Sequence, residues 1–206
     1  MSEKLQKLKK EKQTAIINAA VLEFSKAGFQ NASTNAIVKH AEISKGSLFQ
    51  YFSDKRELYF FILDYSLDRN YEYVAAHFEK FKTHDFLSRI ELYIDLQIEF
   101  AIKFPHEFQI FLHSLVDDTH SFNGDLIKHV QKRAEQRNLA EVLIGKDDTK
   151  MLFEKERIFQ LLQYFFNGLK FEVMISNAPD SADFLKKLKI ASKDFFELLR
   201  KGIYLK

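Results

Sequence analysis

The chain has 206 residues, and its 31 Lys and Arg against 29 Asp and Glu give a formal net charge of only +2. It contains no cysteine, which excludes disulfides, thiolate zinc sites and thiol nucleophiles. Two prolines and six glycines provide few tight turns, and this argues against β-sandwiches, barrels and doubly wound sheets.

The opening residues and the hydropathy of the chain indicate whether it is secreted or inserted in a membrane. The opening residues MSEKLQKLKKEK lack the apolar stretch of a secretory signal. No uncharged apolar run reaches the roughly 18 residues that a membrane-spanning helix needs. We therefore expect a cytoplasmic protein with no membrane partner.

Charge and aromatic residues divide the chain into two parts. Residues 1–56 contain ten Lys and Arg but five Asp and Glu, a net charge of +5, whereas the remaining 150 residues carry −3. Eighteen of the 22 phenylalanines lie after residue 56. We predict a cationic domain over 1–56, suited to a polyanionic partner, and a second, aromatic-rich helical domain over 57–206.

The first helix is predicted near 10–27. Ile16, Ala20 and Phe24 recur at helical spacing and form one apolar stripe. Gly28 stands where a left-handed residue commonly ends a helix.

Three more helices follow in the N-terminal part. A two-turn helix begins at Ser33 or Thr34, either of which can cap it. Ser44 can cap a third helix, in which Leu48 and Phe52 share one face. Asp54 can cap a fourth, which we expect to run from about Lys55 towards Phe81.

The rest of the chain is also predicted to be helical. The apolar pattern, with Pro105 at a first turn and Gly145 and Pro179 at helix ends, indicates helices near 85–103, 105–117, 124–144, 149–177 and 181–203. The fold class expected is all-α.

The N-terminal helices have the proportions of a helix-turn-helix unit. The whole turn between the second and third helices is Glu42 and Ile43. In such a unit the third helix lies in the major groove of DNA and the start of the second approaches the backbone. The positions around the buried Leu48 and Phe52 carry polar or cationic side chains, namely Lys45, Ser47, Gln50 and Tyr51, followed by Lys55 and Arg56.

The segment from Phe24 to Tyr59, FSKAGFQNASTNAIVKHAEISKGSLFQYFSDKRELY, resembles the DNA-binding signature of the tetracycline-repressor (TetR/AcrR) family. About a dozen positions agree in register. The resemblance implies an N-terminal helix-turn-helix domain joined by a long helix to a C-terminal bundle for ligand binding and dimerisation. It also implies a ligand-responsive repressor, released from a near-palindromic DNA operator by a partly apolar small molecule.

The resemblance assigns roles to individual residues. Lys45, Tyr51 and Lys55, with the Thr34 hydroxyl, would hold phosphates. Gln50 and Ser47 are the candidates for base edges, and Gly46 would let the backbone come close to the DNA.

Three positions depart from the family pattern. Glu42 stands where glycine is usual, so it must adopt a left-handed conformation or bend the turn differently. Phe49 replaces a usual tyrosine and has no hydroxyl to offer a phosphate. Val38 replaces a usual alanine.

The second part of the chain offers candidates for an effector pocket and for a dimer interface. Phenylalanines that could line an apolar pocket between helices are Phe78, Phe100, Phe104, Phe108, Phe111 and Phe122. The last two helices are apolar around more than half their circumference, which favours a core on one side and a second subunit on the other. The interface candidates are Phe159, Leu162, Phe166, Leu188, Phe195 and Leu199.

Alternative hypotheses remain at this stage. One is a helical protein that binds apolar ligands without recognising DNA. Another is a metal-assisted enzyme at His113, Asp117 and His120, which are spaced to share a helical face. No known catalytic or dinucleotide motif is present, so we expect neither catalysis nor a cofactor. The lysines at positions 4–12 are either an arm that approaches DNA or a solvated extension.

Overall fold

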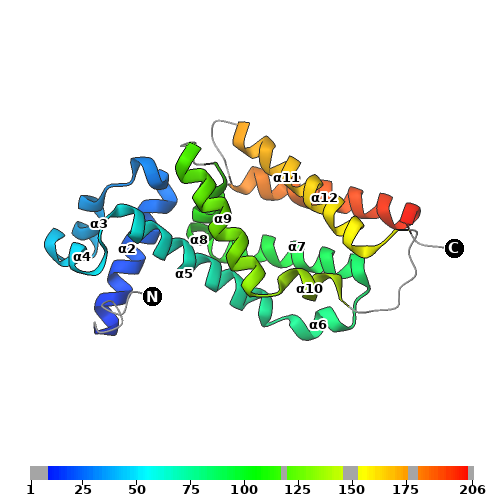
Figure 1. The fold of residues 1–206 in the computed structure, drawn as a ribbon, viewed down its shortest axis with the longest axis horizontal. Coiled ribbons are helices and arrows are strands. Elements are labelled where there is room, and N and C mark those ends of the chain that lie inside the picture. The colour runs from blue at the N-terminus through cyan, green and yellow to red at the C-terminus, as the bar shows by residue number, and fades with distance from the viewer. Residues whose placement is uncertain (1–8, 117–119, 146–152, 176–180, 204–206) are drawn as a thin grey trace. The chain divides into compact units, whose positions relative to one another are not determined.

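The computed structural model describes residues 9–116, 120–145, 153–175 and 181–203, and within these ranges it contains helices and no strands (Figure 1). The all-α prediction is therefore confirmed. In chain order the helices are α2 (Lys10–Asn31), α3 (Thr34–His40), α4 (Lys45–Tyr51), α5 (Lys55–Ala75), α6 (Phe78–Lys82), α7 (Phe86–Lys103), α8 (Pro105–Val116), α9 (His120–Gln136), α10 (Leu139–Ile144), α11 (Lys155–Ile175) and α12 (Ser181–Ile203).

The chain forms two compact units. The head unit consists of residues 1–69 and 104–127, and the body unit consists of residues 70–103 and 128–206. Two of the boundaries fall inside α5 and α9, and the third falls between α7 and α8. The predicted division at residue 56, which rests on charge and aromatic content, differs from this division by packing, in which α8 joins the N-terminal helices.

The packing of α8 against α2 explains why a distant segment joins the head unit. His113 donates from Nε2 to the Ser25 carbonyl oxygen at 3.1 Å. The Ser25 hydroxyl also bonds with His106 Nδ1 at 3.0 Å. Gly28, with φ of 64°, interrupts α2 beside this contact, and a Cβ at this glycine would lie 3.4 Å from His113 Nδ1. The predicted helix end at Gly28 is confirmed in part: φ is positive, but ψ of −175° lies outside the left-handed helical region, and helical residues continue to Asn31.

An ion pair joins α5 to α8 within the head unit. Arg69 Nη1 donates to Glu107 Oε1 at 2.8 Å, and the guanidinium lies 4.3 Å from the centre of the Phe104 ring. Glu107 is 9% exposed. Because removal of either partner would leave a largely buried charge, this pair fixes α8 on the head unit.

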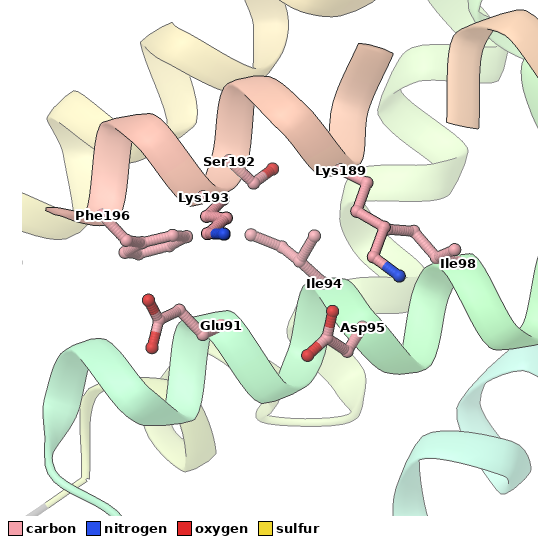
Figure 2. A pocket seen from close by; sticks show the side chains of 8 residues that line it. All are labelled: Glu91, Ile94, Asp95, Ile98, Lys189, Ser192, Lys193 and Phe196. Atoms are coloured by element: carbon pink, nitrogen blue, oxygen red, sulfur yellow. The ribbon is translucent and has the colours of Figure 1, made fainter. Parts of the chain in front are cut away.

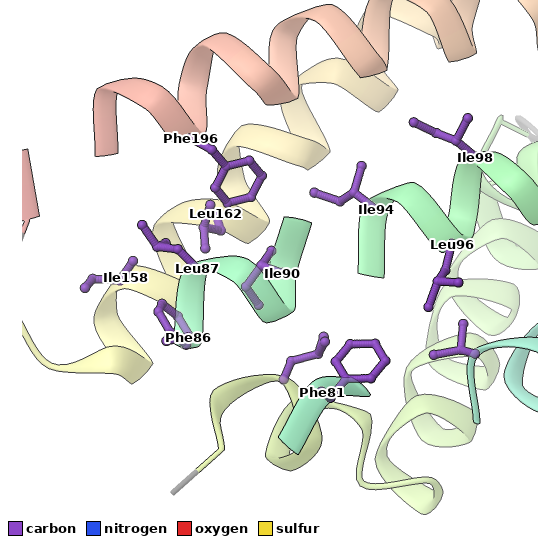
Figure 3. Packing of buried hydrophobic residues seen from close by; sticks show 12 residues of the cluster. Phe81, Phe86, Leu87, Ile90, Ile94, Leu96, Ile98, Ile158, Leu162 and Phe196 are labelled. Atoms are coloured by element: carbon purple, nitrogen blue, oxygen red, sulfur yellow. The ribbon is translucent and has the colours of Figure 1, made fainter. Parts of the chain in front are cut away.

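The body unit is organised around one apolar cluster, shown in Figure 3. Apolar residues of α5, α6, α7, α10, α11 and α12 meet there, because these helices present apolar side chains to the same interior. The fully buried members are Val74, Phe81, Phe86, Leu87, Ile90, Ile94, Leu96, Ile98, Leu143, Ile158, Leu162 and Phe196.

A buried arginine closes the end of α10 in the body unit. Arg89 donates from Nε to the Leu143 carbonyl at 3.0 Å and from Nη2 to the Ile144 carbonyl at 2.8 Å. Its third bond, from Nη1, goes to the His84 carbonyl at 2.8 Å. The guanidinium thereby satisfies the free carbonyls at a helix C-terminus, where a cation is also favoured by the helix dipole. Gly145 follows with φ of 64°.

Two helices that were predicted as continuous are each interrupted in the structure. The helix expected from Lys55 to Phe81 is two helices, because α5 ends at Ala75 and α6 begins at Phe78. The helix expected over 124–144 begins at His120 and breaks after Gln136. Asn138 adopts the left-handed conformation at that break, with φ of 50°. Apolar spacing continues across both breaks, so periodicity alone could not locate them.

The helix expected over 149–177 begins, among the described residues, at Lys155. Within the described part of the chain, none of the helices has the length and hydropathy needed to cross a membrane.

We predict opposite effects of adding a methyl group at two glycines. In Gly145→Ala the new Cβ would clash with the Arg89 guanidinium, and alanine would have to adopt a positive φ of 64°. We expect the free energy of unfolding to fall by about 1–3 kcal/mol. Gly124→Ala is the control, because Gly124 lies within α9 with nothing within 4 Å of its Cβ position. It should raise stability by up to about 1 kcal/mol. Urea unfolding of both variants measures the difference, and equal effects would contradict the role of Gly145.

Candidate nucleic-acid interface

The turn between α3 and α4 is closed by two backbone hydrogen bonds. The Ile43 amide donates to the Val38 carbonyl at 3.0 Å, and the Glu42 amide donates to the Lys39 carbonyl at 3.3 Å. This is the Schellman pattern, which requires a left-handed residue at its centre. Glu42 occupies that position with φ of 53°. Of the two conformations that the sequence allowed, Glu42 therefore adopts the left-handed one.

Two serines begin the helices on either side of this turn. The Ser33 hydroxyl accepts a hydrogen bond from the Ala36 amide at 3.3 Å, and the Ser44 hydroxyl accepts one from the Ser47 amide at 3.1 Å. Each satisfies an amide that a helix N-terminus leaves free. The start of α4, and hence the direction of its side chains, is fixed by Ser44.

One face of α4 is buried and the other is exposed to solvent. Leu48 is buried on α4, and Phe52, which follows the helix, is buried 5.4 Å from the Phe61 ring centre. The opposite face carries exposed positions, namely Lys45, Gly46, Phe49 and Gln50. A side chain as large as Phe49 is unusual on a solvated face, and it is 39% exposed.

Four of the predicted DNA contacts are half-buried: Thr34, Ser47, Tyr51 and Lys55. The Ser47 hydroxyl lies 2.9 Å from that of Ser44, so it belongs to the capping arrangement of α4. Sequence reasoning did not find this pairing, although the Ser44-x-x-Ser47 spacing is a signal for it.

Lys55 performs a structural role that sequence reasoning missed. Its Nζ donates to the carbonyl oxygens of Gln30 at 3.0 Å and Ala32 at 3.1 Å. The ammonium also lies 4.9 Å from the centre of the Phe29 ring. Lys55 thus ties the start of α5 to the end of α2, and two of its three N–H donors are engaged within the protein.

The neighbouring charges at the start of α5 are also paired within the head unit. The Asp54 carboxylate accepts from the Glu57 amide at 2.8 Å, and the Glu57 carboxylate accepts from the Ser53 amide at 2.6 Å. Arg56 forms an ion pair with Asp125. The freely exposed cation at the centre of the predicted interface is therefore Lys45, rather than Lys55 or Arg56.

The phenylalanines predicted to line a pocket are divided between the two units. Phe78 and Phe100 belong to the body unit, whereas Phe104, Phe108 and Phe111 belong to the head unit. Phe100 and Phe108 are buried, and the other three are partly buried. The side chain of Phe122 lies outside the described residues. The structure does not bring these residues into one cavity of either unit.

The residues predicted for a dimer interface mostly lie against the core of the body unit. Leu162 is 2% exposed and belongs to the central cluster, so a partner subunit cannot reach it. Phe159, Leu188, Phe195 and Leu199 are partly buried against the same cluster. The side chain of Phe166 lies outside the described residues. The outward positions of α11 and α12 carry other apolar side chains, namely Leu161, Tyr164, Ile190 and Leu198.

The metal hypothesis placed three side chains on one helical face. His113 belongs to α8 and His120 begins α9, so these two histidines are not on one helix. Asp117 lies outside the described residues. Among the residues that the structure does describe, no group of three or more His, Asp or Glu side chains is placed to hold a metal ion.

Comparison with known proteins gives a family match within the head unit. Residues 16–60 match a model described as bacterial regulatory proteins, tetR family. Over 100 residues the chain is 33% identical to the HTH-type transcriptional regulator RutR of Escherichia coli strain K12, which covers 48% of this chain and 46% of RutR. The match thus spans about half the length of its curated relatives.

Solved structures extend the likeness over nearly the whole fold. A TetR-like transcriptional regulator from Rhodococcus sp. RHA1 aligns with a TM-score of 0.62 at 20% identity, covering 93% of this chain and 94% of that one. AibR, solved in complex with isovaleryl coenzyme A and operator DNA, aligns with a TM-score of 0.56 at 16% identity, covering 86% and 95%. At these identities the likeness establishes the fold.

We predict that Glu42→Gly stabilises the head unit. Glycine adopts the left-handed conformation without the steric cost that Glu42 carries at φ of 53°, so we expect the free energy of unfolding to rise by about 1 kcal/mol. Glu42→Ala is the matched control, since it removes the same carboxylate but keeps a Cβ. Urea titration followed by circular dichroism measures both. Equal stabilisation by alanine would show that charge, and not backbone strain, limits the turn.

We also predict that Lys55→Met destabilises the head unit although it removes a surface cation. The variant loses both hydrogen bonds to the carbonyls at the end of α2, and we expect unfolding to be easier by about 1–3 kcal/mol. Lys26→Met, at an exposed position of α2, should stay within about 0.5 kcal/mol of the parent. If the two variants unfold alike, the Lys55 bonds contribute nothing to stability.

Proposed function

We propose, from the match of residues 16–60 to the tetR-family model and from the N-terminal signature, that the chain is a ligand-responsive transcription regulator of the TetR family that represses its target in the cytoplasm. Two copies present α4 to successive major-groove faces of a near-palindromic operator. Such half-sites are about 34 Å apart, one helical turn of DNA. The proposal gives the protein no catalytic role.

The observation that carries the proposal is the exposed face of α4. Lys45, Phe49 and Gln50 project from a helix whose other face is buried through Leu48 and whose start is capped by Ser44. A short helix fixed in this way can enter a major groove while its buried face stays packed against the head unit. The exposed side chains of α4 are thus available for contacts with DNA.

Phosphate and base contacts are assigned to different side chains. Lys45, with the Thr34 hydroxyl and the remaining N–H of Lys55, holds phosphates, and such contacts set affinity and salt dependence. Gln50 reads a base edge, because its amide can pair with adenine through two hydrogen bonds. Phe49 offers an apolar surface, which in a major groove suits a thymine methyl group.

The second copy is proposed to bind through α11 and α12. Both helices carry large apolar side chains that their own core leaves exposed: Leu161 and Tyr164 on α11, and Ile190 and Leu198 on α12. A two-fold axis would make this patch self-complementary. The interface thus uses the residues next to those that sequence periodicity selected.

The regulatory signal is proposed to be a partly apolar small molecule bound by the body unit. AibR, which shares the fold, was solved in complex with isovaleryl coenzyme A and operator DNA. By analogy, we propose that this chain also binds both a small molecule and operator DNA. A ligand shifts DNA affinity only through its different affinities for two conformations, typically by a coupling of about 1–3 kcal/mol. Helices α5 and α9 each supply residues to both units, and both are continuous elements available to carry the change.

The proposal is tested by DNA binding of the purified full chain. A gel-shift assay with the DNA upstream of its own reading frame, competed by unrelated DNA of equal length, should give a specific complex. Selection from random duplexes should then return a two-fold symmetric site. Binding to both DNAs with equal affinity would contradict sequence-specific regulation.

We predict that Gln50→Ala and Lys45→Ala separate specificity from affinity. Gln50→Ala should cost about 1–3 kcal/mol on the preferred operator and relax the preference at one position in each half-site. Lys45→Ala should weaken all duplexes alike and reduce the slope of log K against log salt by about 1 for each bound subunit. Lys80→Ala, at an exposed position of α6 in the body unit, is the control for charge. Unchanged base preference in Gln50→Ala would remove its assigned role.

We predict that Ile190→Glu combined with Leu198→Glu converts the dimer to a monomer, because two charges would be buried in an apolar interface. Sedimentation velocity measures the mass, and circular dichroism checks the fold. Ile102→Glu, at an equally exposed apolar position of α7, should leave the dimer intact. A double variant that remains dimeric would place the interface elsewhere.

A further inference from the structure

A cavity of about 260 Å³ lies between α7 and α12 within the body unit. Figure 2 shows its two sides: Glu91 and Asp95 come from α7, and Lys189 and Lys193 come from α12. Both pairs are spaced by four residues, so each forms a row on one helix face. An acidic row and a basic row therefore oppose each other across a space.

The two rows are not joined to each other. Glu91 forms its ion pair with Arg200, which neutralises that carboxylate. Within the part of the chain that the structure describes, neither Lys189 nor Lys193 forms an ion pair with Asp95 or Glu91. Opposite charges that face each other without contact leave room for a molecule that carries both signs.

The inner surface of the cavity is largely apolar. Ile94, Ile98 and Phe196 line it, and all three are buried in the body unit. Ser192 adds one buried polar atom. Its hydroxyl donates to the Leu188 carbonyl at 2.6 Å, so its free lone pairs are acceptors for a ligand donor.

This combination restricts the ligand to one chemical class. The volume is below the roughly 300–1,000 Å³ of sites for drug-sized molecules, so the ligand is small. The apolar surface favours a hydrocarbon group, the lysines favour an anion, and Asp95 with Ser192 favours a cationic donor. A simple fatty acid would leave Asp95 without a partner, and a simple amine would leave Lys189 without one. Lys193 also interacts electrostatically with Glu197, one turn further along α12.

We propose that this cavity binds a small zwitterion with an apolar substituent, namely an α-amino acid with an aliphatic or aromatic side chain. Its carboxylate lies between Lys189 and Lys193, its ammonium group faces Asp95 and Ser192, and its side chain covers Ile94, Ile98 and Phe196. As an effector site this inference rests on the proposed regulatory function, whereas binding of the amino acid does not depend on it.

The cavity is compatible with the dimer interface proposed above. Ile190 and Leu198 do not line it, and at about 100° per residue along α12 they lie roughly 60° and 140° around the helix from Lys193. Association of two copies through those residues leaves the cavity accessible.

The test is isothermal titration calorimetry of the full chain with L-leucine and L-phenylalanine. Two analogues remove one charge each from leucine: 4-methylpentanoate lacks the ammonium group, and 3-methylbutylamine lacks the carboxylate. We expect at least one amino acid to bind and each single-charge analogue of leucine to bind about tenfold more weakly or worse. No heat from either amino acid at millimolar concentration, or equal binding of 4-methylpentanoate and leucine, would overturn the proposal.

Variants locate the site. Asp95→Asn and Lys193→Met should each weaken binding about tenfold without changing the melting temperature, since both side chains are exposed at the rim. Asp194→Asn and Lys186→Met are matched controls at exposed positions of α12 outside the cavity, and their affinities should stay within about twofold of the parent. Equal losses in both sets would place the ligand elsewhere.

The regulatory part of the inference has its own readout. The amino acid that binds is added to the gel shift with the operator DNA, and we expect the affinity for DNA to change in the parent but not in Lys193→Met. Binding by calorimetry without any effect on the DNA complex would reject the effector role and leave the site intact. A failed calorimetry experiment with an intact DNA complex would reject the site and leave the proposed repressor unaffected.

Discussion

The geometry of the candidate interface depends on the two-residue turn between α3 and α4. The bond from the Ile43 amide to the Val38 carbonyl forces the chain to reverse at Glu42, and only a left-handed residue can occupy that point. The direction of α4 follows, and Leu48 is directed into the core. Every exposed side chain of α4 is oriented by this constraint. The protein maintains it with a glutamate, at a steric cost that glycine would not carry.

The elements of this unit could be predicted because their signals are local. Ser33 and Ser44 cap their helices through amides three residues away, and Leu48 and Phe52 mark the inner face. The double role of the lysine at the start of α5 could not be predicted in this way. Lys55 reaches carbonyls 25 and 23 positions earlier in the chain, and no sequence pattern distinguishes such a lysine from one that faces solvent.

The body unit was harder to predict, for two physical reasons. Apolar spacing continues through the breaks before α6 and α10, and a left-handed asparagine, Asn138, ends a helix as effectively as glycine would. The charges around the cavity are individually ordinary surface residues. Glu91 and Asp95 gain meaning only because α12 brings Lys189 and Lys193 opposite them, almost a hundred residues further along the chain.

The contact of α8 with α2 has a consequence for how such proteins can be recombined. The bonds from His106 and His113 to Ser25 bridge 81 and 88 positions of sequence, so one face of the N-terminal helices is completed by a segment from the middle of the chain. A chimaera that transplants only the first seventy residues onto another regulator would carry an unmatched surface at α2. Exchange of the proposed operator specificity requires transfer of either the whole discontinuous module or the α4 surface alone.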